Sequence, residues 1–423
     1  MLNLKKKEIM KKIVTIVGLL LASLALVYPQ TKLDNTEIGD AIENEYRFDH
    51  AINVNHISVD VIDGIATLTG SVNNLKAKER ATKIAEMVKG VRAVSNQINV
   101  KPPMLLSDGG IKDRIDQALF DDPAADSYEV EVSVDDKVVT LTGTVDSYQE
   151  KELCGDVAKS VKGVVDLNNM ITVNFKRDRP DYEISNEIEE ALKWNALVDD
   201  GLIEVEVKKG NVELSGVVGR AAEKRNAFYT AWVGGVKSVD HSELEVEWWA
   251  KDEDLRKNKY LTKSDEEIEQ AIIDAALYDP RVLSFHITPD VQSGWVTLRG
   301  TVSNLKAKKA ARKLAEHTVG VAGVTNRIKV KTPTPPTDIE VEKNIEAALS
   351  DNAITESWEI DVSVNNGTAT LMGVVDSHLE KNEAEWVASA INGVDEVNNV
   401  LKVNYPYSYY WWGHYPYYDL HIT

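Results

Sequence analysis

The sequence of 423 residues lacks much of what marks a disulfide scaffold or a nucleic-acid-binding protein. It contains one cysteine, Cys154, so no internal disulfide can form, and a lone cysteine is most often a small buried residue. Basic residues are outnumbered, because 48 Lys and Arg against 68 Asp and Glu give a net charge of −20. Nucleic acid and anionic lipid are both attracted by clustered lysine and arginine, so we expect no nucleic-acid partner.

Residues arranged for catalysis or metal binding are also missing. The eight histidines are scattered, and no two of them combine with a third ligand at the spacing of a zinc site. Acidic pairs such as Asp121-Asp122 and Asp199-Asp200 do not provide the alternating oxygen ligands of a calcium loop. No nucleophile elbow, phosphate-binding loop or dinucleotide fingerprint occurs. We therefore expect no enzyme activity, no catalytic residue, no cofactor and no bound metal.

What the sequence does contain is a unit of about seventy residues, written five times. Each copy has a Leu-x-Gly triplet and a second glycine nineteen or twenty residues later. The first glycines are 73, 73, 84 and 73 residues apart, and this regularity indicates one supersecondary unit copied along the chain. The repeat-defining glycines are Gly70 and Gly90, Gly143 and Gly163, Gly216 and Gly235, Gly300 and Gly320, and Gly373 and Gly393. We expect them to serve backbone conformation rather than a ligand.

Hydrophobic periodicity predicts the same order of elements in every unit. In the second unit Ile111, Ile115 and Leu119 lie on one face of a helix, and an alternating run that predicts a half-buried strand follows. Turn pairs such as Asp63-Gly64 then indicate a hairpin, and a second helix and a last strand close the unit. The fold class is α+β: a tandem array of five small αββαβ units, each a three-stranded sheet with two helices on one face.

Local motifs refine this prediction. Ser264 to Glu267 and Thr337 to Glu340 each fit a capping box at a helix start. Gly90 fits a left-handed C-cap at the end of the second helix, and Asp135-Asp136 is expected to form the hairpin turn of the second unit. A unit of roughly 65 residues buries only about 60% of its unfolded surface, so neighbouring units should support each other.

Proline-containing spacers and a charged stretch divide the chain. The expected segments are a signal peptide at 1–28, units at 34–101, 107–175, 181–248, 264–331 and 337–404, a charged linker at 249–263, and an aromatic tail at 405–423. Asn74-Leu75-Lys76-Ala77-Lys78 recurs 230 residues later, as does Val145-Asp146-Ser147, so the order reads A-B-C-A′-B′. A final C unit is missing, and the aromatic tail stands in its place.

The N-terminus predicts export from the cytoplasm. Five lysines precede an apolar run from Ile13 to Val27, which is short for a transmembrane helix and suits a secretory signal. Either a cleaved signal or an uncleaved short anchor fits this pattern, and both place the units in the periplasm. The five lysines and one glutamate of residues 1–28 carry a net charge of +4, so the rest of the chain carries −24.

The unit resembles the BON domain, named for bacterial osmotically inducible periplasmic proteins and nodulation proteins. The resemblance rests on Leu-Thr-Gly at 68–70 and 141–143 and on Val-Lys-Gly-Val at 88–91 and 161–164, and it covers 34–404. It implies a periplasmic or secreted location, no catalytic activity, and a role in binding phospholipid or supporting the envelope under osmotic stress. The third unit departs most, with Asp240-His241 where Asn96 and Asn326 stand elsewhere. If that asparagine contacts a ligand, the third unit has lost the contact.

Aromatic residues gather at the end of each half of the array. Tyr409, Tyr410, Trp411 and Trp412 lie in the tail, and Trp248 and Trp249 follow the third unit. Tyrosine and tryptophan favour the headgroup layer of a membrane, so these six residues are candidate membrane or ligand contacts. The alternatives are that the tail covers an exposed face of the fifth unit, or that it contacts glycan or protein.

The sequence therefore leads to two hypotheses for function. The first is a non-enzymatic envelope protein that contacts phospholipid or membrane surface through its units and its aromatic tail. The second is a scaffold or holdase-like array that binds other envelope proteins. Neither hypothesis fixes the oligomeric state.

Overall fold

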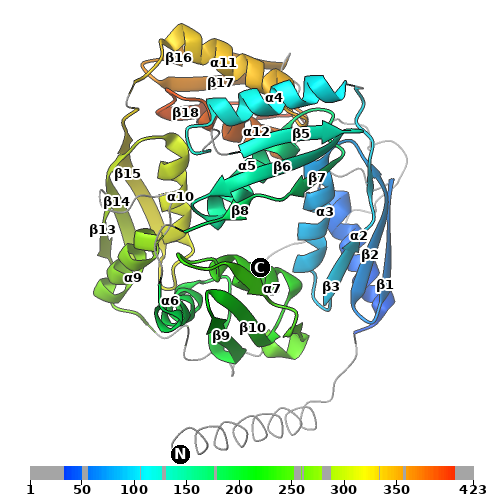
Figure 1. Ribbon diagram of the computed structural model, residues 1–423, viewed down its shortest axis with the longest axis vertical. Coiled ribbons are helices and arrows are strands. Elements are labelled where there is room, and N and C mark those ends of the chain that lie inside the picture. The colour runs from blue at the N-terminus through cyan, green and yellow to red at the C-terminus, as the bar shows by residue number, and fades with distance from the viewer. Residues whose placement is uncertain are drawn as a thin grey trace, which may run out of the picture.

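The computed structural model describes residues 33–49, 56–104, 106–125, 130–175, 179–251, 259, 262–278, 287–332, 334–355 and 359–404. Within these ranges the chain forms five αββαβ units, called units 1 to 5 in chain order (Figure 1). The expected signal peptide, the aromatic tail with Tyr409, Tyr410, Trp411 and Trp412, and most of the charged linker lie outside the described residues.

Units 1 to 3 make up the first part of the array. Unit 1 consists of α2 (Asn35–Phe48), β1 (Ile57–Ile62), β2 (Ile65–Val72), α3 (Leu75–Met87), β3 (Ala93–Asn96) and β4 (Asn99–Val100). Unit 2 consists of α4 (Asp108–Asp121), β5 (Val130–Asp135), β6 (Val138–Val145), α5 (Tyr148–Ser160), β7 (Asp166–Asn169) and β8 (Thr172–Val173). Unit 3 consists of α6 (Asp181–Trp194), η3 (Asp200–Leu202), β9 (Ile203–Lys208), β10 (Asn211–Val218), α7 (Ala221–Thr230), β11 (Ser238–Asp240) and β12 (Leu244–Val246), and η4 (Trp248–Lys251) follows it.

Units 4 and 5 make up the second part. Unit 4 consists of α9 (Asp265–Tyr278), β13 (Ile287–Gln292), β14 (Trp295–Val302), α10 (Leu305–Glu316) and β15 (Gly323–Val330). Unit 5 consists of α11 (Asp338–Asp351), β16 (Ile360–Asn365), β17 (Thr368–Val375), α12 (His378–Ser389), β18 (Glu396–Asn399) and β19 (Lys402–Val403).

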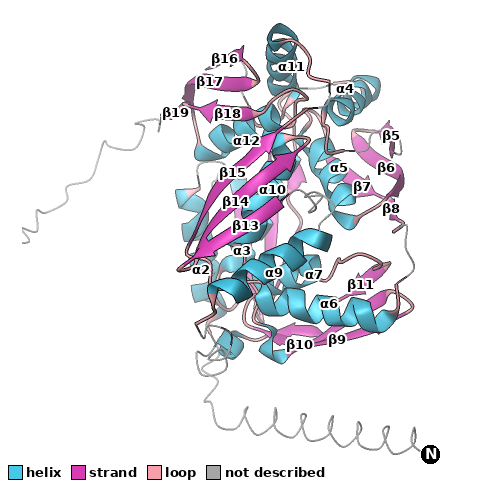
Figure 2. Ribbon diagram, turned by 90° about the vertical axis from the view of Figure 1, so that its left-hand side faces the viewer, coloured by secondary structure: helices cyan, strands magenta, loops and turns pink. Residues whose placement is uncertain are grey.

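Each unit has its own sheet with the return strand of the hairpin at its centre. In unit 1, β2 pairs antiparallel with β1 and parallel with β3 and β4. The α+β prediction of a three-stranded sheet is confirmed, although the last strand is broken into two short pieces in four units and is continuous only as β15 of unit 4. In Figure 2 the strands β13, β14 and β15 face the viewer.

An asparagine side chain fastens the last strand of four units to the second helix. In unit 1 the Asn96 Nδ2 donates to the Lys78 carbonyl at 2.8 Å, and Oδ1 accepts from the Ile98 amide at 3.0 Å. Asn169, Asn326 and Asn399 make the same pair of bonds. These amides serve the fold, so the departure at Asp240-His241 in unit 3 replaces a structural fastening.

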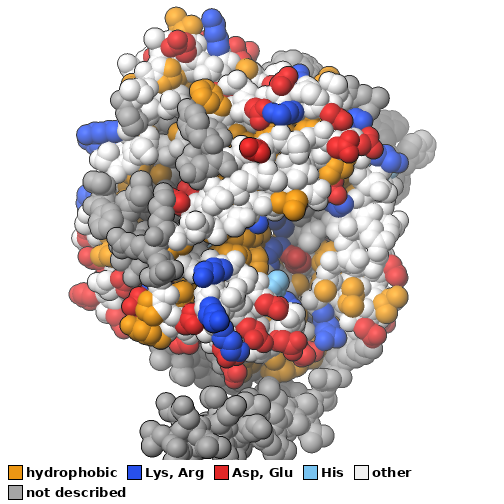
Figure 3. All heavy atoms as spheres, in the orientation of Figure 1, with side chains coloured by type: hydrophobic (Ala, Val, Ile, Leu, Met, Phe, Trp, Pro, Cys, Tyr) orange, Lys and Arg blue, Asp and Glu red, His pale blue; other side chains and the backbone are white. Residues whose placement is uncertain are grey.

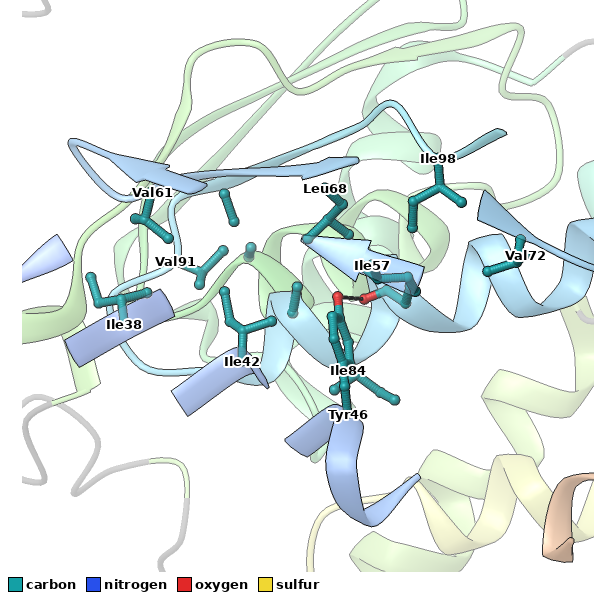
Figure 4. Close-up of a cluster of buried hydrophobic side chains, with 14 of the residues drawn as sticks. Ile38, Ile42, Tyr46, Ile57, Val61, Leu68, Val72, Ile84, Val91 and Ile98 are labelled. Carbon is teal, nitrogen blue, oxygen red and sulfur yellow. Dashed lines mark hydrogen bonds between the residues drawn. The ribbon is translucent and has the colours of Figure 1, made fainter. Parts of the chain in front are cut away.

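The core of each unit lies between the sheet and its two helices. In unit 1 the cluster includes Ile38 and Ile42 of α2, Leu68 of β2 and Ile84 of α3 (Figure 4). Tyr46 is fully buried there, and its hydroxyl donates to the Ala81 carbonyl at 2.8 Å. The predicted helix face of unit 2 is likewise buried, and Cys154 is a fully buried residue of that core.

The glycine of each Leu-x-Gly triplet is required by backbone geometry. Gly70 has φ +120°, and a Cβ there would lie 1.9 Å from the carbonyl oxygen of His56. Gly216 and Gly373 show the same conflict with a backbone oxygen at 2.0 Å. The second glycine also has positive φ, but the C-cap prediction at Gly90 is wrong, because α3 ends at Met87 and its C-cap is the extended residue Val88.

The motifs at the other turns and helix starts are mostly confirmed. Thr337 forms a full capping box with Glu340, and Ser264 exchanges the same two bonds with Glu267. Both residues of the Asp63-Gly64 turn have positive φ. In unit 2 the turn residues are Asp136 and Lys137, so the predicted Asp135-Asp136 turn is displaced by one residue, since Asp135 still pairs with Val138.

Units 1, 2 and 3 form a closed cycle through the first residues of their second helices (Figure 1). Leu75, which begins α3 of unit 1, lies in the core cluster of unit 2. Tyr148, which begins α5 of unit 2, stacks on Trp232 of unit 3 with ring centroids 4.1 Å apart. Ala221, which begins α7 of unit 3, lies in the core cluster of unit 1. Each unit therefore inserts a helix start into the next, and the third returns to the first.

Within the described residues, units 4 and 5 repeat the first contact of that cycle but not the second. Leu305, which begins α10, lies in the core cluster of unit 5. The corresponding His378, which begins α12, is exposed. The A-B-C-A′-B′ order read from the sequence therefore has a counterpart in the packing of the units.

Candidate binding surfaces

The tryptophan pair after unit 3 lies at a contact between units. Trp248 and Trp249 are half-buried in η4, and the Lys89 Nζ of unit 1 lies 4.8 Å from the centre of the Trp248 ring. Next to them Arg92 of unit 1 pairs with Glu247 at 3.5 Å. The structure thus gives Trp248 a role in joining unit 3 to unit 1, and membrane contact by this pair stays a prediction.

A buried charged junction joins four units around Trp386 of α12. The Nζ atoms of Lys76 and Lys306 lie 4.8 and 4.2 Å from the centre of its ring, and these two lysines belong to units 1 and 4. Lys306 also pairs with Asp122 of unit 2, whose side chain has no exposed surface. Cation–π contacts are stronger when they are desolvated, whereas a buried ion pair mainly penalises the loss of one partner, so these residues are used in contacts between units rather than in a binding surface.

A second group of charges joins units 1 and 2. Lys159 lies 3.1 Å from Asp156 and also pairs with Glu79 of unit 1. Burial alone would lower the pKa of Lys159, but Asp156 and Glu79 raise it above its ordinary value. Burial would raise the pKa of Asp156, but Lys76 and Lys159 hold it below its ordinary value. Both groups are therefore charged at neutral pH and act as interface contacts.

An aromatic cluster likewise forms a contact between units 2 and 3. Tyr148 of unit 2 packs on Trp232 and meets Phe228 edge-on with centroids 5.8 Å apart. Burial, followed by the charge of Glu152, raises the pKa of Tyr148 above its ordinary value. The sequence reasoning missed this cluster because its residues come from two units and have no common spacing.

The outer face of the unit 5 sheet carries an apolar strip that the contacts between described residues leave exposed. Met372 and Val374 of β17 are 42% and 45% exposed, and Val400, between β18 and β19, is 47% exposed. The Asn404 amide donates to the Val375 carbonyl at 2.9 Å, so the last described residue lies beside this strip. The unit 5 strip, defined as Met372, Val374 and Val400, is the apolar surface nearest to the aromatic tail along the chain.

The distribution of charge, of potential metal ligands and of long apolar helices describes the chemistry of the described surface. On the face shown in Figure 3, basic side chains are scattered among acidic ones. Within the described ranges no three His, Cys, Asp or Glu side chains are grouped to hold a metal ion. No helix in the described part of the chain combines the length and the hydrophobicity needed to cross a bilayer. The arrangement is that of a repeat-built protein with many surfaces between its units.

Comparison with known proteins identifies the unit. The BON domain model matches residues 34–102, 107–174, 180–247, 264–332 and 337–405. The chain therefore belongs to the BON domain family, which confirms the resemblance drawn from the Leu-x-Gly and Gly-Val motifs.

Two curated relatives match about a third of the chain. Over 141 residues it is 33% identical to Osmotically-inducible protein Y of Escherichia coli (strain K12), and this match covers 32% of this chain and 70% of that protein. Over 139 residues it is 26% identical to the Outer membrane lipoprotein DolP of Haemophilus influenzae, which covers 32% of this chain and 72% of that protein.

Solved structures also match part of the chain. CdsD, a structural protein of the type III secretion system of Chlamydia trachomatis, matches 53% of this chain and 94% of its own at 18% identity, with a TM-score of 0.15. That TM-score is too low to support an inference.

Proposed function

We propose that this protein is a non-enzymatic binding protein of the bacterial cell envelope. It is exported to the periplasm, contacts phospholipid or membrane surface, and supports envelope integrity under osmotic stress. Support comes from its five BON units and from two relatives, one named as osmotically inducible and the other as an outer membrane lipoprotein. The absence of recurring reactive residues in the sequence favours binding over catalysis.

The observation that supports the proposed membrane contact is the exposed unit 5 strip, which the aromatic tail follows in the sequence. Met372, Val374 and Val400 offer an apolar surface, and the chain continues from Asn404 into fourteen residues of which nine are aromatic. Apolar side chains gain about 25 cal/mol for each Å² removed from water, and Tyr and Trp favour the interfacial layer. The strip and Tyr409, Tyr410, Trp411 and Trp412 would act together at one end of the array.

The net charge decides which membrane should be bound. Residues 29–423 carry −24, which repels an anionic surface at long range, and this repulsion is screened beyond about 8 Å at physiological salt. We therefore expect stronger binding to zwitterionic phosphatidylcholine vesicles than to vesicles that contain phosphatidylglycerol, with the difference reduced at high salt.

Vesicle flotation of the protein lacking residues 1–28 tests the proposal. One variant replaces Tyr409, Tyr410, Trp411 and Trp412 with serine, and a second carries Met372→Ser with Val374→Ser. Both variants should lose most of the flotation seen with the unaltered protein. Ile62 and Ile65 form the matched control, because they are 63% and 47% exposed on the hairpin of unit 1.

The outcomes separate the two hypotheses for function. Serine at Ile62 and Ile65 should leave flotation unchanged if the contact lies in unit 5 and the tail. If the unaltered protein does not float with either kind of vesicle, the proposed membrane contact is refuted. The alternative is then a protein-binding scaffold or holdase-like array, and it is favoured by an open groove of about 480 Å³ that α2 and the end of α3 form in unit 1.

A further inference from the structure

Unit 1 has an open groove between α2, from its first turn onward, and the C-terminal end of α3. Its volume is about 480 Å³, and it is lined by Ile38 and Ala41 of α2 and by Ile84, Met87 and Val88 at the end of α3, among others. Met87 is 52% exposed. The carboxylates of Glu37 and Glu45 lie on the rim.

The same place in unit 2 is filled by unit 5. The Asp351 carbonyl accepts from the Lys162 amide at 2.9 Å, and the Ala353 amide donates to the Ser160 carbonyl at 2.6 Å. Asn352 between them forms a two-residue β-bridge with Val161. On the rim, Arg114 of α4 pairs with the Asp351 carboxylate at 2.7 Å. The loop after the first helix of one unit therefore seats on the end of the second helix of another.

Unit 4 receives unit 3 by the same bonds. The Trp194 carbonyl accepts from the Val319 amide at 2.9 Å, and the Ala196 amide donates to the His317 carbonyl at 2.8 Å. Asn195 forms the β-bridge with Thr318. Trp194 packs against the core cluster of unit 4, and the Lys263 Nζ lies 5.4 Å from the centre of its ring.

The two inserted loops share an Asn-Ala pair, which the sequence does not have at the corresponding positions of the other units. In each, the asparagine Oδ1 accepts from the amide two residues on, Leu197 or Ile354, both at 2.8 Å, and the following alanine donates the bond to the socket. The corresponding positions of units 2 and 4 are Pro123 and Pro280, which have no amide hydrogen to donate. Units 2 and 4 therefore accept a loop, and units 3 and 5 provide one.

Unit 3 closes its own groove with a side chain. Arg179 occupies the sequence position of Leu33, and its Nη1 donates to the Gly234 carbonyl at 2.8 Å. Unit 1 has Leu33 at that position, and among the described residues no other unit forms a backbone bond to Met87 or Lys89, the counterparts of Ser160 and Lys162.

We propose that the unit 1 groove is a third socket of this kind and that it binds the helix-end loop of a BON unit in a different protein. The matching loops of units 3 and 5 are already seated within the chain, and proline disqualifies those of units 2 and 4. The occupant would provide an Asn-Ala pair, with the alanine amide donating to the Met87 carbonyl and the preceding carbonyl accepting from the Lys89 amide.

The residues that line the groove determine which residue of the bound loop can precede its asparagine. Unit 1 has Ala41 where unit 2 has Arg114, the residue that pairs with the Asp351 carboxylate. Ala271 of unit 4 also replaces this arginine, and unit 4 accepts Trp194. Unit 1 therefore favours a loop of the type Trp-Asn-Ala over one of the type Asp-Asn-Ala, because a carboxylate would enter an apolar groove rimmed by glutamates.

A labelled peptide with the sequence of residues 181–198, which contains α6 and the Trp194-Asn195-Ala196 loop, tests the proposal by fluorescence anisotropy with the full chain. The matched control peptide carries Ala196→Pro and cannot donate the bond to the socket. We expect saturable binding of the first peptide and at least about tenfold weaker binding of the second, which corresponds to the loss of about 1.4 kcal/mol.

Two variants of the full chain locate the binding. Ala41→Trp fills the groove and Met87→Arg places a charge at its exposed edge, so both should weaken binding at least about tenfold. Ile339→Arg is the control, because Ile339 is 68% exposed on α11 of unit 5. Circular dichroism confirms that each variant is folded, and the exposure of Met87 keeps the second variant informative if the first one does not fold.

Three results would overturn the proposal. Binding that Ala41→Trp and Met87→Arg leave unchanged would place the peptide elsewhere, for example in the socket of unit 4. Equal binding of the Ala196→Pro peptide, or no binding up to about 1 mM, would show that the groove does not recognise the loop. A dimer in light scattering that Met87→Arg dissociates would make the occupant a second copy of this chain. None of these results depends on vesicles, so the proposed membrane contact is tested separately.

Discussion

The pair between Lys306 and Asp122 gives the sharpest test of how the two parts of the array are held together. The Asp122 side chain is fully buried and that of Lys306 is 12% exposed, and the pair joins unit 4 to unit 2. Asp122→Asn keeps an acceptor for the Ala124 amide, which Asp122 Oδ1 holds at 3.0 Å, but it removes the charge opposite Lys306. Because the lysine is left buried without its counter-charge, we expect a loss of about 3 kcal/mol.

A double-mutant cycle separates the cost of leaving Lys306 buried without its counter-charge from the cost of lost packing. Lys306→Met added to Asp122→Asn removes the buried cation and should restore all but about 1 kcal/mol, the remainder being the contact with Trp386. The control is Asp116→Asn on the same helix, whose pair with Lys112 is nearly half exposed on both sides and should contribute less than about 0.5 kcal/mol.

Native-state hydrogen exchange is the suitable assay, because a chain of five units need not unfold in a single step. The opening free energies of the amides in α4 and α10 should fall together in Asp122→Asn. Equal protection of these helices in Asp122→Asn and Asp116→Asn would refute the reasoning, since the pair would then contribute no more than a surface pair does.

The remaining predictions concern single units. Gly70→Ala should lower the free energy of unfolding of unit 1 by at least about 3 kcal/mol in denaturant unfolding, because the residue has positive φ and a Cβ would clash with a carbonyl oxygen. Gly109→Ala on α4 should raise it by about 0.5–1 kcal/mol, because no atom lies within 4 Å of the added Cβ. A loss of stability at Gly109 as large as at Gly70 would contradict this. Burial raises the pKa of Tyr46 above its ordinary value near 10, so its stabilising effect is complete below about pH 10 and is lost as the pH rises further. Tyr46→Phe should therefore lower stability by about 1 kcal/mol at pH 7 and reduce its fall above about pH 10, as followed by thermal unfolding at a series of pH values. Cys154 should react with a thiol reagent only at the rate of unfolding, and fast labelling of the native protein would argue against its burial.

The fold of each unit was predictable because it depends on signals close together in the sequence. The helix face of Ile111, Ile115 and Leu119 is fully buried as predicted, and the paired glycines mark backbone conformations that only glycine adopts without strain. The details that failed, the C-cap at Gly90 and the turn at Asp135, are errors of one or two residues. Periodicity locates an element but does not fix its last hydrogen bond.

The contacts between units could not be predicted in the same way. Leu75, Tyr148 and Ala221 occupy equivalent positions and make equivalent contacts, yet they share neither size nor polarity, so no pattern marks them. The candidate surfaces show the same limit. Trp248 looks like a surface aromatic in the sequence but is half-buried against Lys89, whereas Met372 and Val374 look like ordinary strand residues and are exposed.

The closed cycle of units 1 to 3 has a consequence for a chain delivered to the periplasm with its N-terminus first. The core of unit 1 includes Ala221, so the first unit to arrive is completed only after the third has followed. Among the buried residues of the unit 2 core cluster only Leu75 comes from another unit, and it has already arrived, whereas Trp386 of unit 5 packs against the edge of this cluster later. The buried core of unit 2 can therefore form before that of unit 1, and part of the apolar surface of unit 1 stays uncovered until a segment more than one hundred residues behind it has arrived.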